Sequence, residues 1–156
     1  MDRANQRPPA RGLLIGCGLI AEGHLDGYDR VDELMIATVI EPSTRRRDYA
    51  RAVLPGAEVV ASLDDVDLSA HDFVDICSPP STHLQYARRA LSEGLPTLCE
   101  KPLVLDLTEL AALVDAEQRS GGLVYPCHNY AFAPSMQRLF ELLTSFRDDD
   151  GVTRGH

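Results

Sequence analysis

A chain of 156 residues has room for one domain with a sizeable core, but not comfortably for two. Its composition, 44% hydrophobic and 25% charged, is that of a globular protein. The net charge of -9 argues against nucleic-acid and anionic membrane partners, since both would repel the chain. An anionic ligand would therefore have to be held by local backbone donors.

No apolar run reaches the roughly 18 to 20 residues that a membrane helix needs, and the start of the chain lacks the apolar core of a signal peptide. We therefore expect a cytoplasmic protein with a short, Pro-containing tail over residues 1–10. The cysteines show no C-x-x-C spacing, so small buried thiols are favoured over a metal site or a disulfide framework. All of them nevertheless fall near the ends of predicted strands, namely Cys17, Cys77, Cys99 and Cys127.

The stretch LLIGCGLIAEGH at residues 13–24 combines a short buried strand with a glycine-rich turn. It contains a match to G-x-G-x-x-G/A, and each small residue of this motif has a structural role. Gly16 permits a tight turn, Gly18 lets a pyrophosphate approach the backbone, and Ala21 lets the next helix pack closely. The N–H groups at the start of that helix would hold the anion. An ordinary strand-to-helix turn is the alternative.

The helix after this turn is expected over residues 19–29 and carries His24, which we interpret as packed or capping rather than catalytic. The next strand, at residues 35–40, ends at Glu41, which comes 23 residues after Gly18. At that spacing an acidic side chain accepts hydrogen bonds from the adenosine ribose hydroxyls. Because its charge would repel a 2′-phosphate, NAD is favoured over NADP.

Three consecutive arginines, Arg45 to Arg47, follow Glu41 closely. Any of them could pair with a 2′-phosphate. The alternative is a solvated first turn of a helix over residues 43–54 that has Ser43 as its N-cap.

A buried strand at residues 73–77 ends in Ser78-Pro79-Pro80, where the prolines stop it and Ser81 can cap the following helix. His83 lies in the first turn of that helix, and both lining a cofactor and packing the loop remain open for it. A strand at residues 95–99 then delivers Glu100-Lys101-Pro102 to the same edge. In this stiff segment the lysine could reach into a cleft; a Glu-Lys pair on the surface is the alternative.

The last part of the chain repeats the alternation. Asp106, with Glu109 three residues later, predicts a capped helix that ends at Gly121-Gly122. Counting a short third strand expected at residues 59–61, the strand at residues 123–125 is the sixth, and it precedes His128-Asn129-Tyr130. The final helix, over residues 134–146, has apolar side chains on more than one face, so part of it should contact a partner.

Strands alternating with helices predict an α/β fold, a doubly wound parallel sheet of about six strands in the order 3-2-1-4-5-6. In that arrangement the loops that follow the strands emerge along one edge. The sequence therefore predicts a dinucleotide site there, with contributions from the glycine turn, Glu41, the Ser78 loop, Lys101 and Asn129.

Several segments resemble the N-terminal half of the Gfo/Idh/MocA family, which includes glucose-fructose oxidoreductase and inositol dehydrogenase. They are GCGLIAEGHL, the EP after the second strand, DICSPPSTHLQYARRALSEGLPTLCEKPL and HNYAFAP. The EKP motif downstream of Pro-Pro-x-x-His is the most specific of them. The resemblance covers residues 13–143 and implies an NAD(P)-dependent oxidoreductase acting on sugars, sugar derivatives or cyclitols. It also implies a Rossmann domain over residues 11–130 and, over residues 131–156, a linker helix leading to a substrate domain.

The resemblance further implies roles for individual residues. Glu100 would contact the nicotinamide ribose, and Lys101 would face both the nicotinamide and the substrate hydroxyl, where an ammonium stabilises negative charge as hydride leaves. A cis peptide is implied before Pro102. The pyrophosphate would be held at Gly16, Gly18, Leu19 and Ile20, the adenosine ribose at Glu41, and the cofactor channel would be lined by Ser78, Pro79 and His83.

Two departures from the family's pattern stand out. Ala131 occupies a place where the family often has an arginine, and the chain stops about where the family's second domain would begin. That domain binds substrate, carries the catalytic histidine and usually makes the oligomer interface. One hypothesis is therefore an oxidoreductase module completed by another domain, a second chain or a homo-oligomer. Another is a non-catalytic NAD(H)-binding sensor or partner subunit, and a third is a remnant that binds nothing.

Overall fold

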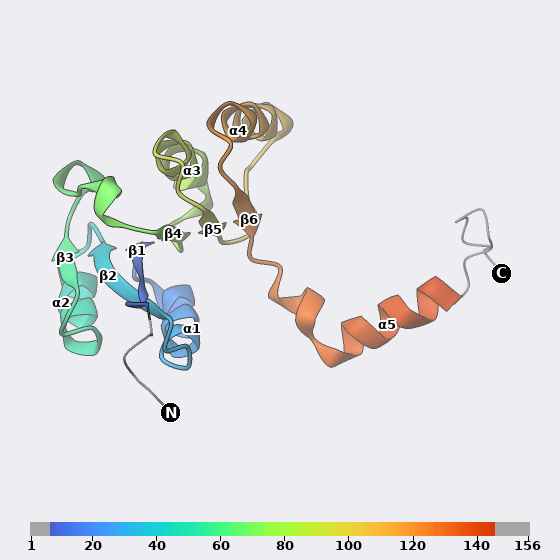
Figure 1. Ribbon diagram of the computed structural model, residues 1–156, viewed down its shortest axis with the longest axis horizontal. Helices are drawn as coiled ribbons and strands as arrows, with labels where there is room; N and C mark the ends of the chain where they lie inside the picture. The colour runs from blue at the N-terminus through green and yellow to red at the C-terminus, as the bar shows by residue number, and fades with distance from the viewer. Residues whose placement is uncertain (1–6, 146–156) are drawn as a thin grey trace. The chain divides into compact units, whose positions relative to one another are not determined.

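The computed structural model describes residues 7–145, which fall into two compact units, and the first ends at Pro126. The first unit is a six-stranded sheet in the order β3-β2-β1-β4-β5-β6, and every neighbouring pair of strands is parallel (Figure 1). This is the strand order expected from the sequence. The prediction of a doubly wound α/β fold is therefore confirmed.

The elements of the first unit alternate along the chain as predicted and differ from the expected ones only at their ends. The strands are β1 (Ala10–Ile15), β2 (Leu34–Ile40), β3 (Glu58–Val60), β4 (Phe73–Ile76), β5 (Thr97–Cys99) and β6 (Val124–Pro126). The helices are α1 (Leu19–Tyr28), α2 (Thr44–Val53), α3 (His83–Ser92) and α4 (Leu107–Ser120), with short 3-10 turns at Leu63–Asp65, Leu68–Ala70 and Pro80–Thr82.

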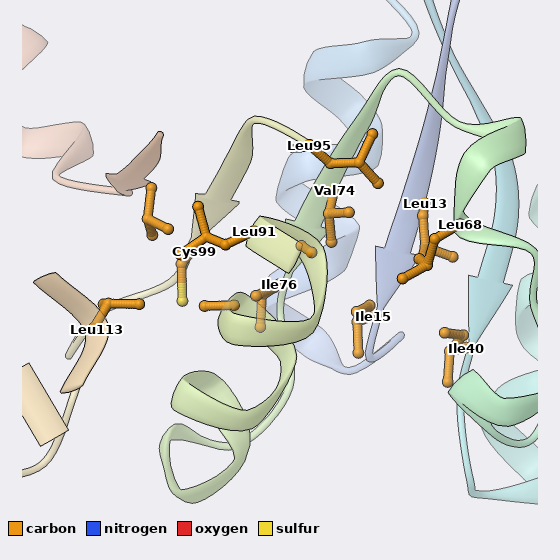
Figure 2. Close-up of a cluster of buried hydrophobic side chains, with 13 residues drawn as sticks. Leu13, Ile15, Ile40, Leu68, Val74, Ile76, Leu91, Leu95, Cys99 and Leu113 are labelled. Atoms are coloured by element: carbon orange, nitrogen blue, oxygen red, sulfur yellow. The ribbon is translucent and has the colours of Figure 1, made fainter. Parts of the chain in front are cut away.

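The sheet has helices on both faces, with α1 and α2 on one side and α3 and α4 on the other (Figure 1). Successive side chains of a strand point to opposite faces, and neither Leu13 nor Leu14 of β1 is exposed at all. On the α3 and α4 side, the apolar side chains of β1 and β4 pack with Leu91 and Leu113 (Figure 2). Burial on both faces explains why these strands are continuous apolar runs rather than alternating ones.

Helix α4 begins with the predicted cap. The Asp106 side chain accepts a hydrogen bond from the Glu109 N–H at 2.8 Å, and the Glu109 carboxylate accepts one from the Leu105 N–H at 2.8 Å. At its other end, Gly121 adopts the left-handed conformation, with φ at 67°. The sequence signals at both ends of this helix are thus confirmed.

The predicted cap of α3 was wrong. Ser81 lies inside the 3-10 turn Pro80–Thr82, and α3 begins only at His83. Thr82 is the residue at the cap position, and its hydroxyl donates to the Pro79 carbonyl at 2.7 Å instead of capping the helix. The turn that starts at Pro80 therefore delays the helix.

The cysteines, all of them among the described residues, carry thiols rather than disulfides. Cys17, Cys77 and Cys99 are buried and Cys127 is partly buried. Within residues 7–145, no helix is long and apolar enough to cross a membrane.

The second unit contains the 3-10 turn Asn129–Phe132 and α5 (Pro134–Ser145). Phe146, which was expected in this helix, lies outside the described residues. Several large apolar side chains of this unit are exposed, including Tyr130, Phe132, Phe140 and Leu143. The domain bounds proposed at residues 10, 130 and 131 stay predictions.

Candidate functional site

The glycine turn leads from β1 into α1 with a different constraint at each glycine. Gly16 has φ at 89°, and a Cβ there would lie 2.8 Å from the backbone Cα of Ser78. Gly18 occupies the cap position of α1 without a side-chain hydrogen bond, and a Cβ built on it would meet nothing within 4 Å. Gly16 therefore serves the turn, whereas Gly18 leaves open space beside the uncapped start of a helix, where backbone N–H groups favour an anion.

This turn forms one wall of a cleft of about 540 Å³ at the carboxyl ends of β1, β2 and β4. The strand order reverses between β1 and β4, so the cleft lies at the topological switch point of the sheet. Its lining includes most of the residues predicted to contact a cofactor, namely Gly16, Gly18, Leu19, Ile20, Glu41, Ser78 and Pro79.

Glu41 lies at the end of β2 and is only 8% exposed. One of its carboxylate oxygens accepts the Cys17 N–H at 2.8 Å, and the other accepts the Ser43 N–H at 2.8 Å. A carboxylate has about four lone-pair sites, so it retains acceptor capacity for ribose hydroxyls. The side chain thus also fixes the glycine turn to β2, which the spacing alone did not indicate.

Two of the three arginines are partly buried, so the alternative of a fully solvated first turn does not hold for them. The Arg46 guanidinium donates to the Cys17 carbonyl and to Glu22, the latter at 3.0 Å, and lies 4.4 Å from the centre of the Tyr49 ring. Arg47 donates to the backbone carbonyl of Glu41 at 2.9 Å. Tertiary contacts with the glycine turn and α1 hold Arg46, local contacts within the β2–α2 connection hold Arg47, and of the three only Arg45 is exposed. Ser43 has the predicted cap position of α2 but makes no side-chain cap bond.

The thiol of Cys17 lies inside the glycine turn and is fully buried. Burial raises the pKa of Cys17, and the nearby Arg46 only partly opposes this effect. A neutral thiol adds no negative charge to a turn whose N–H groups would face an anion.

His83 connects two loops rather than facing the cleft. It is 1% exposed, with Nδ1 at 2.9 Å from the Pro102 carbonyl and Nε2 at 2.8 Å from the Ser78 carbonyl. This placement favours the loop-packing alternative over direct contact with a cofactor. The Lys101-Pro102 peptide that follows β5 is cis, as the resemblance implied.

Glu100 and Lys101 are not a simple surface pair. Glu100 is 7% exposed and accepts the backbone N–H of Lys101 at 3.0 Å. The Lys101 Nζ atom lies 3.8 Å from the same carboxylate oxygen, while the lysine side chain is 44% exposed. A buried carboxylate thus holds the base of an accessible cationic side chain, which is moreover the only lysine of the chain.

His24 is packed rather than capping, which was one of the two interpretations, and it contacts two carboxylates. Its Nδ1 atom lies 2.8 Å from Asp75, which is wholly buried in β4, and its Nε2 atom lies 3.1 Å from Glu100. The Tyr28 hydroxyl donates to the same Asp75 oxygen at 3.0 Å. The hydrogen bond to Asp75 raises the pKa of His24 to about 9, although burial opposes the shift. The ring is therefore an imidazolium at neutral pH.

Sequence reasoning passed over Asp75, although a signal was present. An aspartate inside the apolar strand FVDIC is costly to bury unless it is paired. His24, Asp75 and Cys77 also bring an imidazole, a carboxylate and a thiol within 4.8 Å of one another, and zinc takes such ligands. A metal ion there would have to displace the proton between His24 and Asp75.

Asn129 begins the 3-10 turn Asn129–Phe132 of the second unit and is exposed. Its contact with a cofactor stays a prediction.

A cleft at the switch point of a doubly wound sheet, beside the uncapped start of a helix, defines the class of protein as a dinucleotide-binding Rossmann domain. The chain belongs to the Gfo/Idh/MocA family, whose profile, described as an oxidoreductase family with an NAD-binding Rossmann fold, matches residues 10–128. These residues thus form an NAD-binding domain.

Curated relatives support the same assignment. The chain is 37% identical over 113 residues to an inositol 2-dehydrogenase of Leifsonia xyli, which covers 71% of this chain and 33% of the relative. It is 30% identical over 129 residues to a D-apiose dehydrogenase of Paraburkholderia graminis, with 81% of this chain and 34% of the relative covered. The chain therefore spans about a third of the length of these relatives.

Solved structures share the fold. The WlbA (WbpB) dehydrogenase from Thermus thermophilus, in complex with NAD and UDP-GlcNAcA, has a TM-score of 0.78 and 29% identity, over 89% of this chain and 48% of that one. An apo scyllo-inositol dehydrogenase from Lactobacillus casei has a TM-score of 0.81, with 90% of this chain and 42% of that one covered. Its 21% identity supports the fold alone.

Proposed function

We propose that this chain is the nicotinamide-binding part of an oxidoreductase that moves a hydride between NAD and a hydroxyl or keto carbon of a sugar, a sugar derivative or a cyclitol. The observation that carries the proposal is the placement of Lys101. It is the only lysine, it follows β5 at the carboxyl edge of the sheet, and a buried carboxylate lies at its base. The names of the relatives, inositol 2-dehydrogenase and D-apiose dehydrogenase, support the substrate class.

In this proposal the cleft holds the adenosine and pyrophosphate half of the cofactor. Backbone N–H groups at Gly18, Leu19 and Ile20 bind the pyrophosphate, because the helix start has no side-chain cap. Glu41 accepts the ribose hydroxyls, and Ser78 and Pro79 form the opposite wall. The negative charge of Glu41 disfavours a 2′-phosphate, and Arg46 is already bound to Cys17 and Glu22, so NAD is preferred to NADP.

The nicotinamide end of the cofactor, when bound, supplies the hydride chemistry. Glu100 accepts from the nicotinamide ribose, and the Lys101 ammonium faces the substrate oxygen. There it stabilises the negative charge that develops as hydride leaves the carbon. His83 acts indirectly, because it links the Ser78 loop to Pro102.

We further propose that turnover needs a substrate-binding part that these 156 residues do not contain. The support for this is that the curated relatives are about three times as long as the matched region. A non-catalytic NAD(H)-binding sensor or partner subunit is the second candidate. Retention of the cofactor alone does not need Lys101, so the role of this lysine separates the two candidates.

Protection of Lys101 from acylation tests the proposal with this chain alone. NADH carries a nicotinamide, which should occupy the space around Lys101 when NADH is bound. Bound NADH should therefore slow the acylation of Lys101 by about tenfold or more. ADP fills only the adenosine half and should leave the rate unchanged. The modified residue is identified by mass spectrometry, and the α-amino group serves as the internal control. If ADP protected Lys101 as well as NADH does, or if bound NADH gave no protection, Lys101 would not lie at the hydride-transfer site.

A further inference from the structure

Four residues with alternating charges lead from the interior of the sheet to the segment that follows β5 at its carboxyl edge. Asp75 faces His24 Nδ1 at 2.8 Å, and His24 Nε2 faces Glu100 at 3.1 Å. The other oxygen of Glu100 accepts the Lys101 N–H at 3.0 Å and lies 3.8 Å from its Nζ atom. The charges along this path are negative, positive, negative and positive.

Each nitrogen of the His24 ring lies against a carboxylate oxygen. The ring can donate to both carboxylates only when both nitrogens carry a proton. The resulting cation separates two buried acidic groups that would otherwise repel each other, and a buried carboxylate without a partner would be costly. The side chain of His24 is 11% exposed and does not line the cleft. His24 can therefore affect a bound cofactor only through its neighbours, which are Glu100 and the thiol of Cys77; the Cys77 Sγ atom lies 3.5 Å from Nδ1, and Cys77 lines the cleft.

We infer that His24 is a positioning residue for the hydride-transfer site: its Nε2–H fixes the carboxylate of Glu100, and Glu100 in turn fixes Lys101. The inference rests on the proposed function, which places Glu100 and Lys101 at the nicotinamide end of the cofactor. The Asp75 side of His24 serves another purpose. Asp75 also accepts from Tyr28, so this half of the network holds α1 against β4.

Two substitutions separate these halves. In His24→Asn, the amide nitrogen takes the place of Nδ1, so the bond to Asp75 is kept and the bond to Glu100 is lost. In His24→Gln, the amide nitrogen reaches the place of Nε2, so the bond to Glu100 is kept. His71→Gln is the matched control, since the His71 ring is buried against Thr38 and the Asp67 carbonyl.

The first measurement compares the affinities of the 156-residue chain for NADH and ADP by calorimetry. His24→Asn should weaken the binding of NADH about tenfold, which is the loss expected when one hydrogen bond to a charged group is removed. The affinity for ADP should stay within about twofold of the wild-type value. His24→Gln should keep the affinity for NADH within about threefold of the wild-type value. His71→Gln should change the affinity for neither ligand. A purely structural role predicts equal losses for both ligands, and that result would overturn the inference.

The second measurement needs no cofactor. Selective isotope labelling of lysine gives one side-chain NMR signal, that of Lys101. This signal should shift in His24→Asn, shift less in His24→Gln and stay unchanged in His71→Gln. An unchanged signal in a folded His24→Asn chain would contradict the inference, whatever the chain does with NADH.

A measurement on the wild-type chain completes the test if the variants do not fold. NADH should shift the His24 Nε2 resonance through Glu100, whereas ADP should not. Bound NADH without this shift would overturn the inference, while the absence of NADH binding would overturn the proposed function instead.

Discussion

Glu41 shows how one side chain serves both the fold and the proposed cofactor contact. Its two oxygens accept the N–H groups of Cys17 and Ser43, so the carboxylate is held in place before any ligand arrives. A preorganised acceptor loses little entropy on binding. The spacing from Gly18 predicted an acceptor at this position but not these backbone partners.

Replacement of Glu41 by alanine should weaken NAD binding by about 1–3 kcal/mol, because hydrogen bonds to a charged group are lost. The affinity for NADP should fall less, because the repulsion between Glu41 and the 2′-phosphate disappears as well. Calorimetric titration of both nucleotides measures the two changes. Glu58→Ala, at an exposed acid that starts β3, is the control and should change neither affinity. An unchanged preference for NAD over NADP in Glu41→Ala would show that Glu41 does not select the cofactor.

Residue types and spacing thus make Glu41 and Lys101 candidate site residues, but they could not reveal the contacts of His24. Its partners lie 51 and 76 residues away along the chain. Their meeting depends on the packing of α1 against the sheet, which no local pattern encodes. The position of Asp75 in an apolar strand indicates that this carboxylate has a partner, but not which one.

At the level of elements, the glycine turn separates into a structural and a binding position. Gly16 has a positive φ, and a Cβ on it would collide with the backbone of Ser78, whereas a Cβ on Gly18 would meet open space. The same G-x-G pattern therefore contains two different requirements, and substitutions at the two positions should have different effects.

Gly16→Ala should lower the free energy of unfolding by at least about 1 kcal/mol, because the methyl group meets backbone at a strained φ. Gly18→Ala should change it by less than about 0.5 kcal/mol. Gly18→Ala should nevertheless weaken the binding of NADH by tenfold or more, because the methyl group fills the space in which the pyrophosphate would lie against the backbone. Urea denaturation and NADH titration measure the two quantities. Equal NADH affinity in Gly18→Ala and wild type would place the pyrophosphate elsewhere.

The predicted capping residues differ in outcome, and Ser43 occupies its predicted cap position without a side-chain bond. The Asp106 cap of α4 formed as expected. Ser81 did not cap α3, because the neighbouring prolines make a separate turn and Thr82 bonds back to Pro79. A solvated first turn was one of the two alternatives for the arginines, but Arg46 binds the Cys17 carbonyl, a tertiary contact that helix propensity does not include, and Arg47 binds the carbonyl of Glu41.

At the scale of the whole molecule, the strand order followed from the alternation of strands and helices, because short right-handed crossovers leave few topologies.

The buried charges make the stability of the fold depend on pH. His24 faces Asp75, Glu100 and the Cys77 thiol, with Tyr28 and Lys101 bound to the same carboxylates.

The pKa of His24 rises from 6.5 to about 9 in the folded chain. A raised pKa stabilises the fold fully below pH 6.5, and this contribution disappears as the pH rises through about 9. The free energy of unfolding should therefore fall between pH 7 and pH 10 by at most about 3 kcal/mol. Urea denaturation across this range measures the fall, and His24→Asn should show a smaller one. A wild-type chain with constant stability over this range would contradict the charged state of His24.

The central claim is that this chain is an NAD-binding module whose cleft selects NAD through Glu41. Calorimetric titration of the 156-residue chain with NAD, NADH, NADP and NADPH tests it most directly. We predict micromolar binding of NAD and NADH, and binding of the two phosphorylated forms that is weaker by about tenfold or more. Binding of none of the four nucleotides, or tighter binding of NADPH than of NADH, would contradict the account.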